Sequence, residues 1–309
     1  MKNQSITEAM LQFIEESPTA FHAAANVEAL LLENGFEKLE NLAEGALVPG
    51  GSYYTMQNGS AVLAVKIPEN PAKGFRIAAS HSDSPCFKIK EVPEMKVENT
   101  YVKLNVEKYG GMILSPWLDR PLSVAGRVFV AGKDGKPEVK LVNLKKDLLI
   151  IPNVAIHFNR EINNGFAYNP QTDMAPLMGL DQELSIKKLC AEAADVAEEE
   201  ILGSDLYVYN RDKGRIMGAD DSLIGSPRLD DLQCAYATLR GFLASKPEEF
   251  ISVYALFDNE EVGSGTKQGA DSTFLTDTVR RIAAALNIPE AEWLRKMPDS
   301  FMLSADNAH

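Results

Sequence analysis

Two adjacent glutamates follow directly on a strand-like apolar run, in the stretch ALFDNEEVGSG at 255–265. Glu260 and Glu261 would repel each other there unless a cation or a proton neutralises them. A pair of divalent cations needs bridging and flanking carboxylates, and it activates a water molecule for hydrolysis. Because neighbouring side chains in an extended segment diverge, one glutamate could bind metal while the other acts as general base. The stretch therefore suggests metal-dependent hydrolysis.

Other possible ligands occupy similar positions in the sequence. They follow two further strand-like runs or open a predicted helix: His81 with Asp83, Asp306, and Asp230 with Asp231. In open α/β sheets, active sites gather at the carboxyl ends of strands. Neutral imidazole and carboxylates are suitable ligands for zinc-like cations. Asp83, two residues after His81, could orient the imidazole.

Each signal has an ordinary alternative when it stands alone. A His-x-Asp pair is common, and Asn-Glu-Glu is typical of a surface loop. Asp230 and Asp231 are also typical of a helix N-cap with an acid in the first turn. It is their joint placement at predicted strand and helix ends that favours a metal site.

Composition narrows the class of protein. The chain has 309 residues, 45% of them apolar, which predicts about two globular domains. A net charge of −13 argues against a nucleic-acid surface. The sequence has neither a long apolar run nor a signal-peptide core, so it predicts no membrane span. Three cysteines without C-x-x-C spacing indicate reduced thiols and a cytoplasmic location.

The order of predicted elements indicates an α/β fold with an insertion. Helix and strand signals alternate at both ends of the chain, whereas residues 95–150 carry alternating β-type patterns and 181–201 a helical one. We expect a mixed central sheet with flanking helices and an inserted β-rich domain. The predicted limits are 1–92 and 206–309 for the catalytic domain and 93–205 for the insertion.

Six longer motifs carry a resemblance to a known family. They are AASHSDSPCFKIK (78–90), YGGMILSPWLDRPLSVAGRV (109–128), IPNVAIHFNR (151–160), SPRLDDL (226–232), FDNEEVGS (257–264) and SADNAH (304–309). In this order, and over nearly the whole chain, they resemble the aspartyl aminopeptidase family of dinuclear zinc aminopeptidases. The fold implied is of the zinc-exopeptidase type, with the insertion serving as a dimerisation domain.

The resemblance implies a role for each matching residue. Zinc ligands would be His81, Asp230 (bridging), Glu261 and Asp306; Glu260 would be the general base, and Asp83 would tune His81. His157 would reach a neighbouring subunit's active site and help to stabilise the tetrahedral intermediate. Two Zn²⁺ per subunit are expected, with Co²⁺ or Mn²⁺ as substitutes. The resemblance also implies that dimers assemble into a dodecamer and that the substrates are short peptides.

The resemblance also predicts that the chain is truncated at its C-terminus. The family continues beyond His309, and its last histidine ligand would lie in that part. The expected function is metal-dependent removal of the N-terminal residue from short peptides. The alternatives are a metal-dependent amidase acting on acylated amino acids and a non-catalytic assembly subunit. The sequence leaves open whether acidic residues or neutral or hydrophobic residues are preferred at the N-terminus of the substrate.

Overall fold

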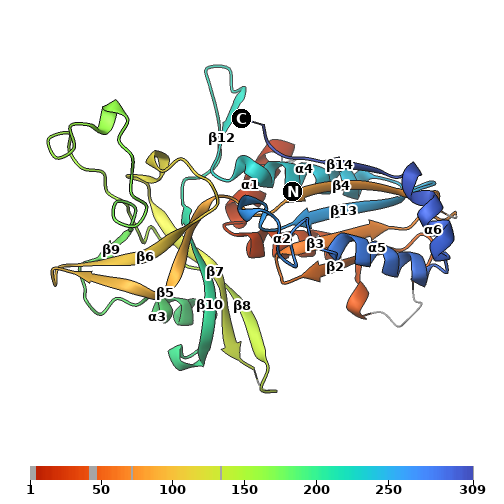
Figure 1. The fold of residues 1–309 in the computed structure, drawn as a ribbon, viewed down its shortest axis with the longest axis horizontal. Coiled ribbons are helices and arrows are strands. Elements are labelled where there is room, and N and C mark those ends of the chain that lie inside the picture. Colours follow the sequence, from red (N-terminus) through yellow and green to blue (C-terminus); the bar gives the residue numbers. More distant parts are fainter. Residues whose placement is uncertain (1–4, 42–46, 71, 133, 309) are drawn as a thin grey trace. The chain divides into compact units, whose positions relative to one another are not determined.

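The protein is described by a computed structural model that covers residues 5–41, 47–70, 72–132 and 134–308. The chain forms two compact units: Met1–Ser84 with Gly214–His309, and Pro85–Lys213 (Figure 1). The first unit is thus built from two sequence segments, with the second unit inserted between them. The junctions lie at Ser84/Pro85 and Lys213/Gly214, whereas the sequence predicted 92/93 and 205/206.

A six-stranded mixed sheet forms the centre of the first unit, in the order β1-β2-β3-β13-β4-β14. Its strands are β1 (Glu37–Lys38), β2 (Ser52–Gln57), β3 (Ala61–Lys66), β4 (Phe75–His81), β13 (Ile251–Phe257) and β14 (Phe301–Ser304). β4 pairs in parallel with both β13 and β14, whereas β3 is antiparallel to its neighbours. The predicted mixed α/β fold is therefore confirmed. A separate antiparallel hairpin joins β11 (Arg215–Met217) to β12 (Leu223–Gly225).

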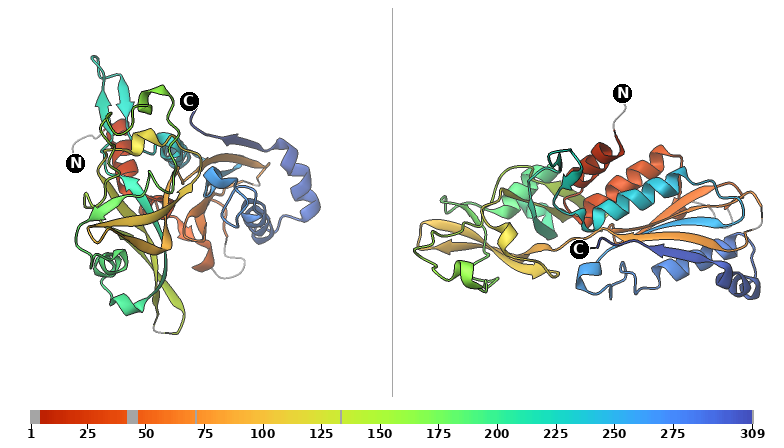
Figure 2. Two further views of the ribbon diagram at one scale, coloured as in Figure 1. Left: turned by 60° about the vertical axis from the view of Figure 1, so that its left-hand side comes forward. Right: turned by 90° about the horizontal axis from the view of Figure 1, so that it is seen from above.

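Helices cover both faces of this sheet (Figure 2). One side carries α1 (Ile6–Glu16), α2 (Ala20–Glu33) and α4 (Leu229–Ala244), and the other carries α5 (Phe274–Ala285) and α6 (Glu290–Lys296). The first group buries Phe13, Leu31 and Leu239 against Tyr254 of β13. Short 3₁₀ turns complete the unit: η1 (Leu39–Asn41), η5 (Glu260–Val262) and η6 (Met297–Asp299).

Residues suited to helix ends mark the start of α1 and the end of α2. Ser5 Oγ accepts the backbone N–H of Glu8 at 3.2 Å, and a Glu8 carboxylate oxygen accepts the backbone N–H of Ser5 at 2.9 Å. This reciprocal pair is a capping box, which satisfies otherwise unpaired helix-end donors. Gly35 follows α2 with φ 80°, the left-handed conformation common after a helix end.

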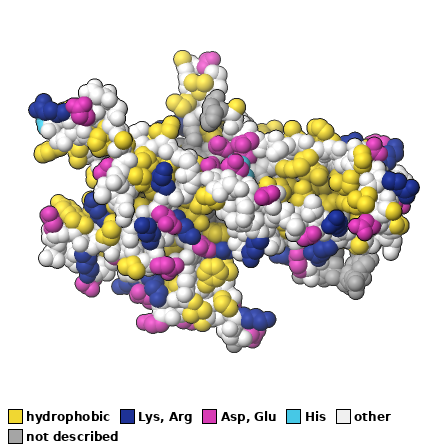
Figure 3. All heavy atoms as spheres, in the orientation of Figure 1, with side chains coloured by type: hydrophobic (Ala, Val, Ile, Leu, Met, Phe, Trp, Pro, Cys, Tyr) yellow, Lys and Arg dark blue, Asp and Glu magenta, His cyan; other side chains and the backbone are white. Residues whose placement is uncertain are grey.

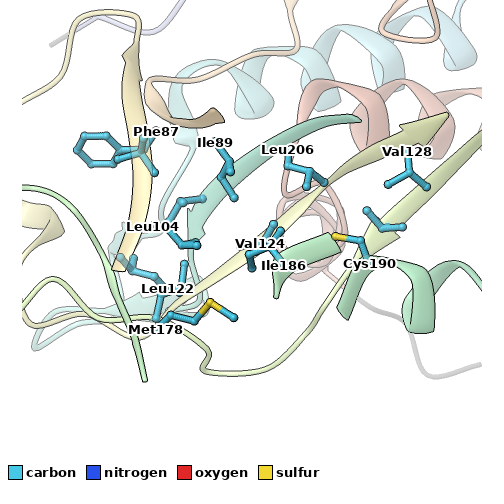
Figure 4. Close-up of a cluster of buried hydrophobic side chains, with 14 of the residues drawn as sticks. Phe87, Ile89, Leu104, Leu122, Val124, Val128, Met178, Ile186, Cys190 and Leu206 are labelled. Carbon is cyan, nitrogen blue, oxygen red and sulfur yellow. The ribbon is translucent and has the colours of Figure 1, made fainter. Parts of the chain in front are cut away.

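An antiparallel six-stranded sheet forms the second unit, in the order β8-β7-β10-β5-β6-β9. Its elements are β5 (Cys86–Val97), β6 (Tyr101–Tyr109), η2 (Ser115–Trp117), β7 (Leu122–Ala131), β8 (Pro137–Asn143), η3 (Ile162–Asn164), β9 (Leu177–Gly179), α3 (Ile186–Ala194), η4 (Glu198–Glu200) and β10 (Ile201–Asn210). Ile186 and Cys190 of α3 pack with sheet residues such as Leu122 and Val124 (Figure 4). This unit therefore has its own hydrophobic core.

Two local expectations differ from the structure. The helical pattern at 181–201 yields a shorter helix, because Asp195 adopts φ 52° after Ala194 and Ile201 already begins β10. Residues 206–210 of β10 were predicted to lie in the catalytic domain, but the whole strand pairs with β7 and β5 of the inserted sheet. An apolar alternation shows that a strand has a buried face, but not which sheet it joins.

No helix among the described residues is both long and apolar enough to cross a membrane.

Candidate metal centre

The parallel strands β4, β13 and β14 bring three chain segments to one edge of the sheet. His81, the last residue of β4, pairs with Phe257 at the end of β13. Ser304 of β14 pairs with Ala79 of β4, and Ala305 N–H donates to the carbonyl of Ala79 at 2.8 Å. If the parallel pairing of Ser304 with Ala79 is continued by two residues, Asp306 lies beside His81. The carboxyl ends of parallel strands are where open α/β sheets hold their ligands.

Three carboxylates surround the outer ring nitrogen of His81. His81 Nε2 lies 3.4 Å from Asp230 Oδ1, 3.7 Å from Asp306 Oδ1 and 3.9 Å from Glu260 Oε2. The imidazole is buried, but the three carboxylate side chains are about half exposed, at 50%, 59% and 48% respectively. Acidic side chains gather on this face near the C-terminal end of the chain (Figure 3). An ion could therefore reach the group directly from solvent.

Ligand atoms of His81, Asp230, Asp231 and Asp306 all lie within 4.8 Å of one another. One imidazole and several carboxylate oxygens form a donor set that suits zinc and similar divalent cations. The residues present thus fit a zinc site. Glu261, which the family resemblance implies as a ligand, is not in this group of four, whereas Asp231, to which the resemblance gives no role, is.

Asp83 connects the histidine to the two glutamates. Its buried carboxylate lies 3.3 Å from His81 Nδ1 and accepts the backbone N–H groups of Glu260 and Glu261, each at 3.2 Å. A partner on the second ring nitrogen fixes the orientation of a ligating imidazole. Asp83 also holds η5, which carries both glutamates. This position suits the orienting role that the sequence suggested.

A second layer of contacts, which the sequence analysis did not predict, holds Asp231 and the C-terminal segment. Asp231 is fully buried, and its Oδ2 accepts the backbone N–H of His81 at 3.1 Å. Asn307 Nδ2 donates to Asp231 Oδ1 at 3.2 Å and to the carbonyl of Leu229 at 2.8 Å. Asn307 thereby fastens the segment that carries Asp306 to the start of α4. Its place in the SADNAH motif was the only sequence signal for it.

The turn before Glu260 depends on Asn259, which the sequence analysis also missed. Asn259 adopts φ 62°, a left-handed conformation that asparagine tolerates better than most residues. Its Oδ1 accepts hydrogen bonds from Thr266 Oγ1 and Gln268 Nε2, both at 2.8 Å. These contacts redirect the chain from β13 into η5 and set the direction of Glu260.

Burial and neighbouring charges shift the pKa values of His81, Asp231 and Glu261. Burial lowers the pKa of His81, but the hydrogen bond and charge of Asp83, with the charges of Asp231 and Glu260, outweigh it and raise that pKa to about 9. Burial raises the pKa of Asp231 to about 6. Burial, then the charge of Asp83, raises the pKa of Glu261 to about 7. The clustered carboxylates thus favour a bound proton or a bound cation.

His157 lies in the second unit, on an exposed segment between β8 and β9. Its apolar neighbours Ile156 and Phe158 are 45% and 85% exposed. His309 lies outside the described residues. The first unit thus brings together the six predicted site residues from His81 to Asp306, while His157 belongs to the other unit.

The profile of the "Aminopeptidase I zinc metalloprotease (M18)" family matches residues 13–309. A "Probable M18 family aminopeptidase 2" from Clostridium acetobutylicum is 44% identical over 318 aligned residues, which cover 100% of this chain and 73% of the relative. Among solved structures, a chain of the "Ape4 and Nbr1 complex" superposes with a TM-score of 0.92 at 32% identity, covering 98% of this chain and 63% of that one. The "S. cerevesiae mApe1 dodecamer" gives 0.83 at 26% identity, covering 99% and 72%.

The fold and the donor set define a metallohydrolase of the mixed α/β type. The chain belongs to the M18 family of aminopeptidases, a family of zinc metalloproteases. It spans 73% of the length of its Clostridium acetobutylicum relative and 63% of the matched chain from the "Ape4 and Nbr1 complex".

Proposed function

We propose that this chain provides the active site of an aminopeptidase that removes the N-terminal residue from short peptides. The observation that carries the proposal is the convergence of His81 with Asp230 and Asp306, with Glu260 Oε2 at 3.9 Å from the same imidazole nitrogen. Family membership supports the reaction class. A cytoplasmic location remains a prediction from the sequence.

His81, Asp230, Glu261 and Asp306 would hold two zinc ions, with Asp230 between them. Asp231, a member of the close group of four, would act mainly by fixing the backbone of His81. Bound zinc supplies a Lewis acid that polarises the scissile carbonyl and makes water more acidic. Co²⁺ or Mn²⁺ would substitute because the oxygen and nitrogen donors accept either ion.

Glu260 would act as the general base. Its half-exposed carboxylate can take a proton from the attacking water and return it to the leaving amine. Asp83 holds the backbone of Glu260 and so sets where that carboxylate points. The surrounding acidic groups would also attract the ammonium group of a free peptide N-terminus. That preference separates an aminopeptidase from an amidase acting on acylated substrates.

The chain would act as a homo-oligomer, in which the inserted unit mediates dimerisation. One solved structure of the same fold is described as a dodecamer. The exposed apolar side chains beside His157 support a contact with another copy. In that arrangement His157 would reach a neighbouring subunit's site and stabilise the tetrahedral intermediate. Enclosure within such an assembly would restrict substrates to short peptides.

Release of N-terminal Asp, Glu, Leu and Met from peptides, with added Zn²⁺ or Co²⁺, tests the proposal. The zinc content is measured on the same sample, and matched N-acetylated peptides are run in parallel. Turnover of the free-amine peptides supports the aminopeptidase, whereas turnover of only the acetylated set identifies an amidase. Intact oligomers without bound metal or turnover would identify an assembly subunit.

Glu260→Gln supplies the sharpest control within this experiment. The amide is nearly the same size but cannot accept a proton, so turnover is expected to fall by at least ~10²-fold while zinc content stays unchanged. Asp271→Asn is the matched control, because Asp271 is an exposed carboxylate of the same unit. Retained activity in Glu260→Gln would contradict the assignment of the base.

A further inference from the structure

The β11–β12 hairpin forms a two-stranded sheet of its own in the first unit. Across it, Ile216 pairs with Ile224, and Met217 pairs with Leu223. Side chains directly opposite each other on paired strands share a face, and successive residues alternate between faces. Each face of the hairpin therefore carries one apolar pair.

Both apolar pairs are exposed. Ile216, Met217, Leu223 and Ile224 are 43%, 45%, 57% and 39% exposed. Figure 1 shows the hairpin extending away from the helices, and in Figure 3 it carries apolar side chains with acid at its tip. An isolated two-stranded hairpin is at best marginally stable in water, and clustered exposed apolar residues mark an interaction surface.

The base of the hairpin is firmly attached to α1. A β-carbon added at Gly214 would meet Leu11 Cδ2 at 2.6 Å, so these two residues are in close contact. Arg228, just after the hairpin, donates from Nη2 to the carbonyl of Ile14 at 3.0 Å. The hairpin is thus presented from a fixed base, which lowers the entropy cost of docking.

Opposite charges lie at opposite ends of the hairpin. Arg215 begins β11 at the base, while Asp220 and Asp221 lie in the exposed tip between the strands. Asp220 Oδ1 accepts the Ser222 hydroxyl at 2.7 Å and so closes the turn. Among the described residues, no ion pair involves Arg215 or Asp221. Two hairpins packed antiparallel would place each base against the other's tip, with attraction at both ends.

We propose that the hairpin 215–225 is a contact between two copies of this chain, packed antiparallel through their apolar pairs. Each Arg215 then lies against the acidic tip of the partner copy. A hairpin this short covers less than the ~800 Å² per partner of a standard interface, so it acts within a larger assembly. The inference rests on the proposed homo-oligomer, but not on the proposed hydrolysis.

Sedimentation velocity on the full chain over a range of concentrations tests this contact. The variants are Arg215→Glu, Asp221→Arg and Leu223→Glu, each checked for folding by circular dichroism. Matched controls elsewhere in the first unit are Arg240→Glu and Asp271→Arg, which reverse charge on exposed side chains.

We expect Arg215→Glu and Leu223→Glu to shift the wild-type oligomer to smaller species, with at least tenfold weaker association. Asp221→Arg should act less strongly, because Asp220 remains. An equimolar mixture of Arg215→Glu and Asp221→Arg chains should recover the larger species, because opposite charges then meet at both ends. The controls should sediment like wild type.

Two results would overturn the proposal. A wild-type chain that is monomeric at every concentration removes the assembly and the contact together. An oligomeric wild type whose size is unaffected by Arg215→Glu and Leu223→Glu, or is equally affected by the controls, removes the contact alone. Both results come from sedimentation and not from peptide turnover. A failure of the hairpin contact can therefore be distinguished from a failure of the proposed hydrolysis.

Discussion

Replacing Asp83 should damage the metal centre more than replacing any other single carboxylate outside the ligand set. Asp83 is 4% exposed, and its carboxylate serves three groups: His81 Nδ1 and the backbone N–H groups of Glu260 and Glu261. The two carboxylate oxygens accept the backbone N–H groups of Glu260 and Glu261, one each. In Asp83→Asn one of these oxygens becomes an NH₂ group, which cannot accept, so one of the two backbone N–H groups loses its hydrogen-bond acceptor.

The expected loss of stability follows from the number of hydrogen bonds that the substitution removes. Leaving one buried donor unpaired costs roughly 1–3 kcal/mol of unfolding free energy. The loss of charge also lowers the pKa of His81 and relieves repulsion on Glu261, two effects that oppose each other at pH 7. We therefore expect Asp83→Asn to destabilise the metal-free protein by ~1–3 kcal/mol, and Asp83→Ala by more. His81 Nδ1 also lies 3.1 Å from the backbone carbonyl of Asp83, which the substitution leaves in place. We therefore expect zinc affinity to weaken by about 10-fold, the lower end of the range for an altered orienting partner.

The assay is urea unfolding of the chelator-treated chain, together with zinc affinity measured by competition with a chromophoric chelator. Asp271→Asn, at an exposed position of the same unit, controls for the loss of one negative charge. If Asp83→Asn matched that control in both measurements, the reasoning about its three contacts would be refuted.

Three further predictions concern the same chain. His157→Ala should lower peptide turnover without changing zinc content, and an unchanged rate would remove its proposed role. The metal-free protein should become less stable as pH rises from about 6.5 to 9. The raised pKa of His81 gives stability that is complete below its ordinary value of 6.5 and is lost as pH rises through about 9. The raised pKa values of Asp231 and Glu261, about 6 and about 7, lower the stability mainly as pH rises through a more acidic range, so His81 dominates the change over this one. Thermal melts of the chelator-treated chain at pH 6 and 9 test this, with His81→Gln expected to flatten the difference. Asn307→Ala, which removes both donors to the start of α4, should weaken zinc binding by releasing the segment that carries Asp306, and an affinity equal to wild type would contradict that anchoring role.

Local sequence signals were sufficient for the first helices and for the strand ends that carry ligands. Ser5 caps the start of α1 and Gly35 follows the end of α2, in each case through chemistry within a few residues of the helix end. Apolar runs ending in His81 and before Asp258 indicated strands whose exits could meet, because buried strands need such runs in any sheet. The types of ligand and their chain order were therefore readable without tertiary information.

Tertiary structure decided which of these residues meet, and how. The parallel register of β4 with β14 sets Asp306 beside His81, although 225 positions separate them in sequence. The burial of Asp231 against the backbone of His81, and the reach of Asp83 to two amides of η5, depend on the folding of the chain around them. Likewise, β10 joins the inserted sheet because its partners β7 and β5 lie there. Sequence alone determined the chemistry available to this protein, because side-chain type and local periodicity are local properties. Only the fold fixed distances and pKa values, because these arise from groups that are distant in the chain.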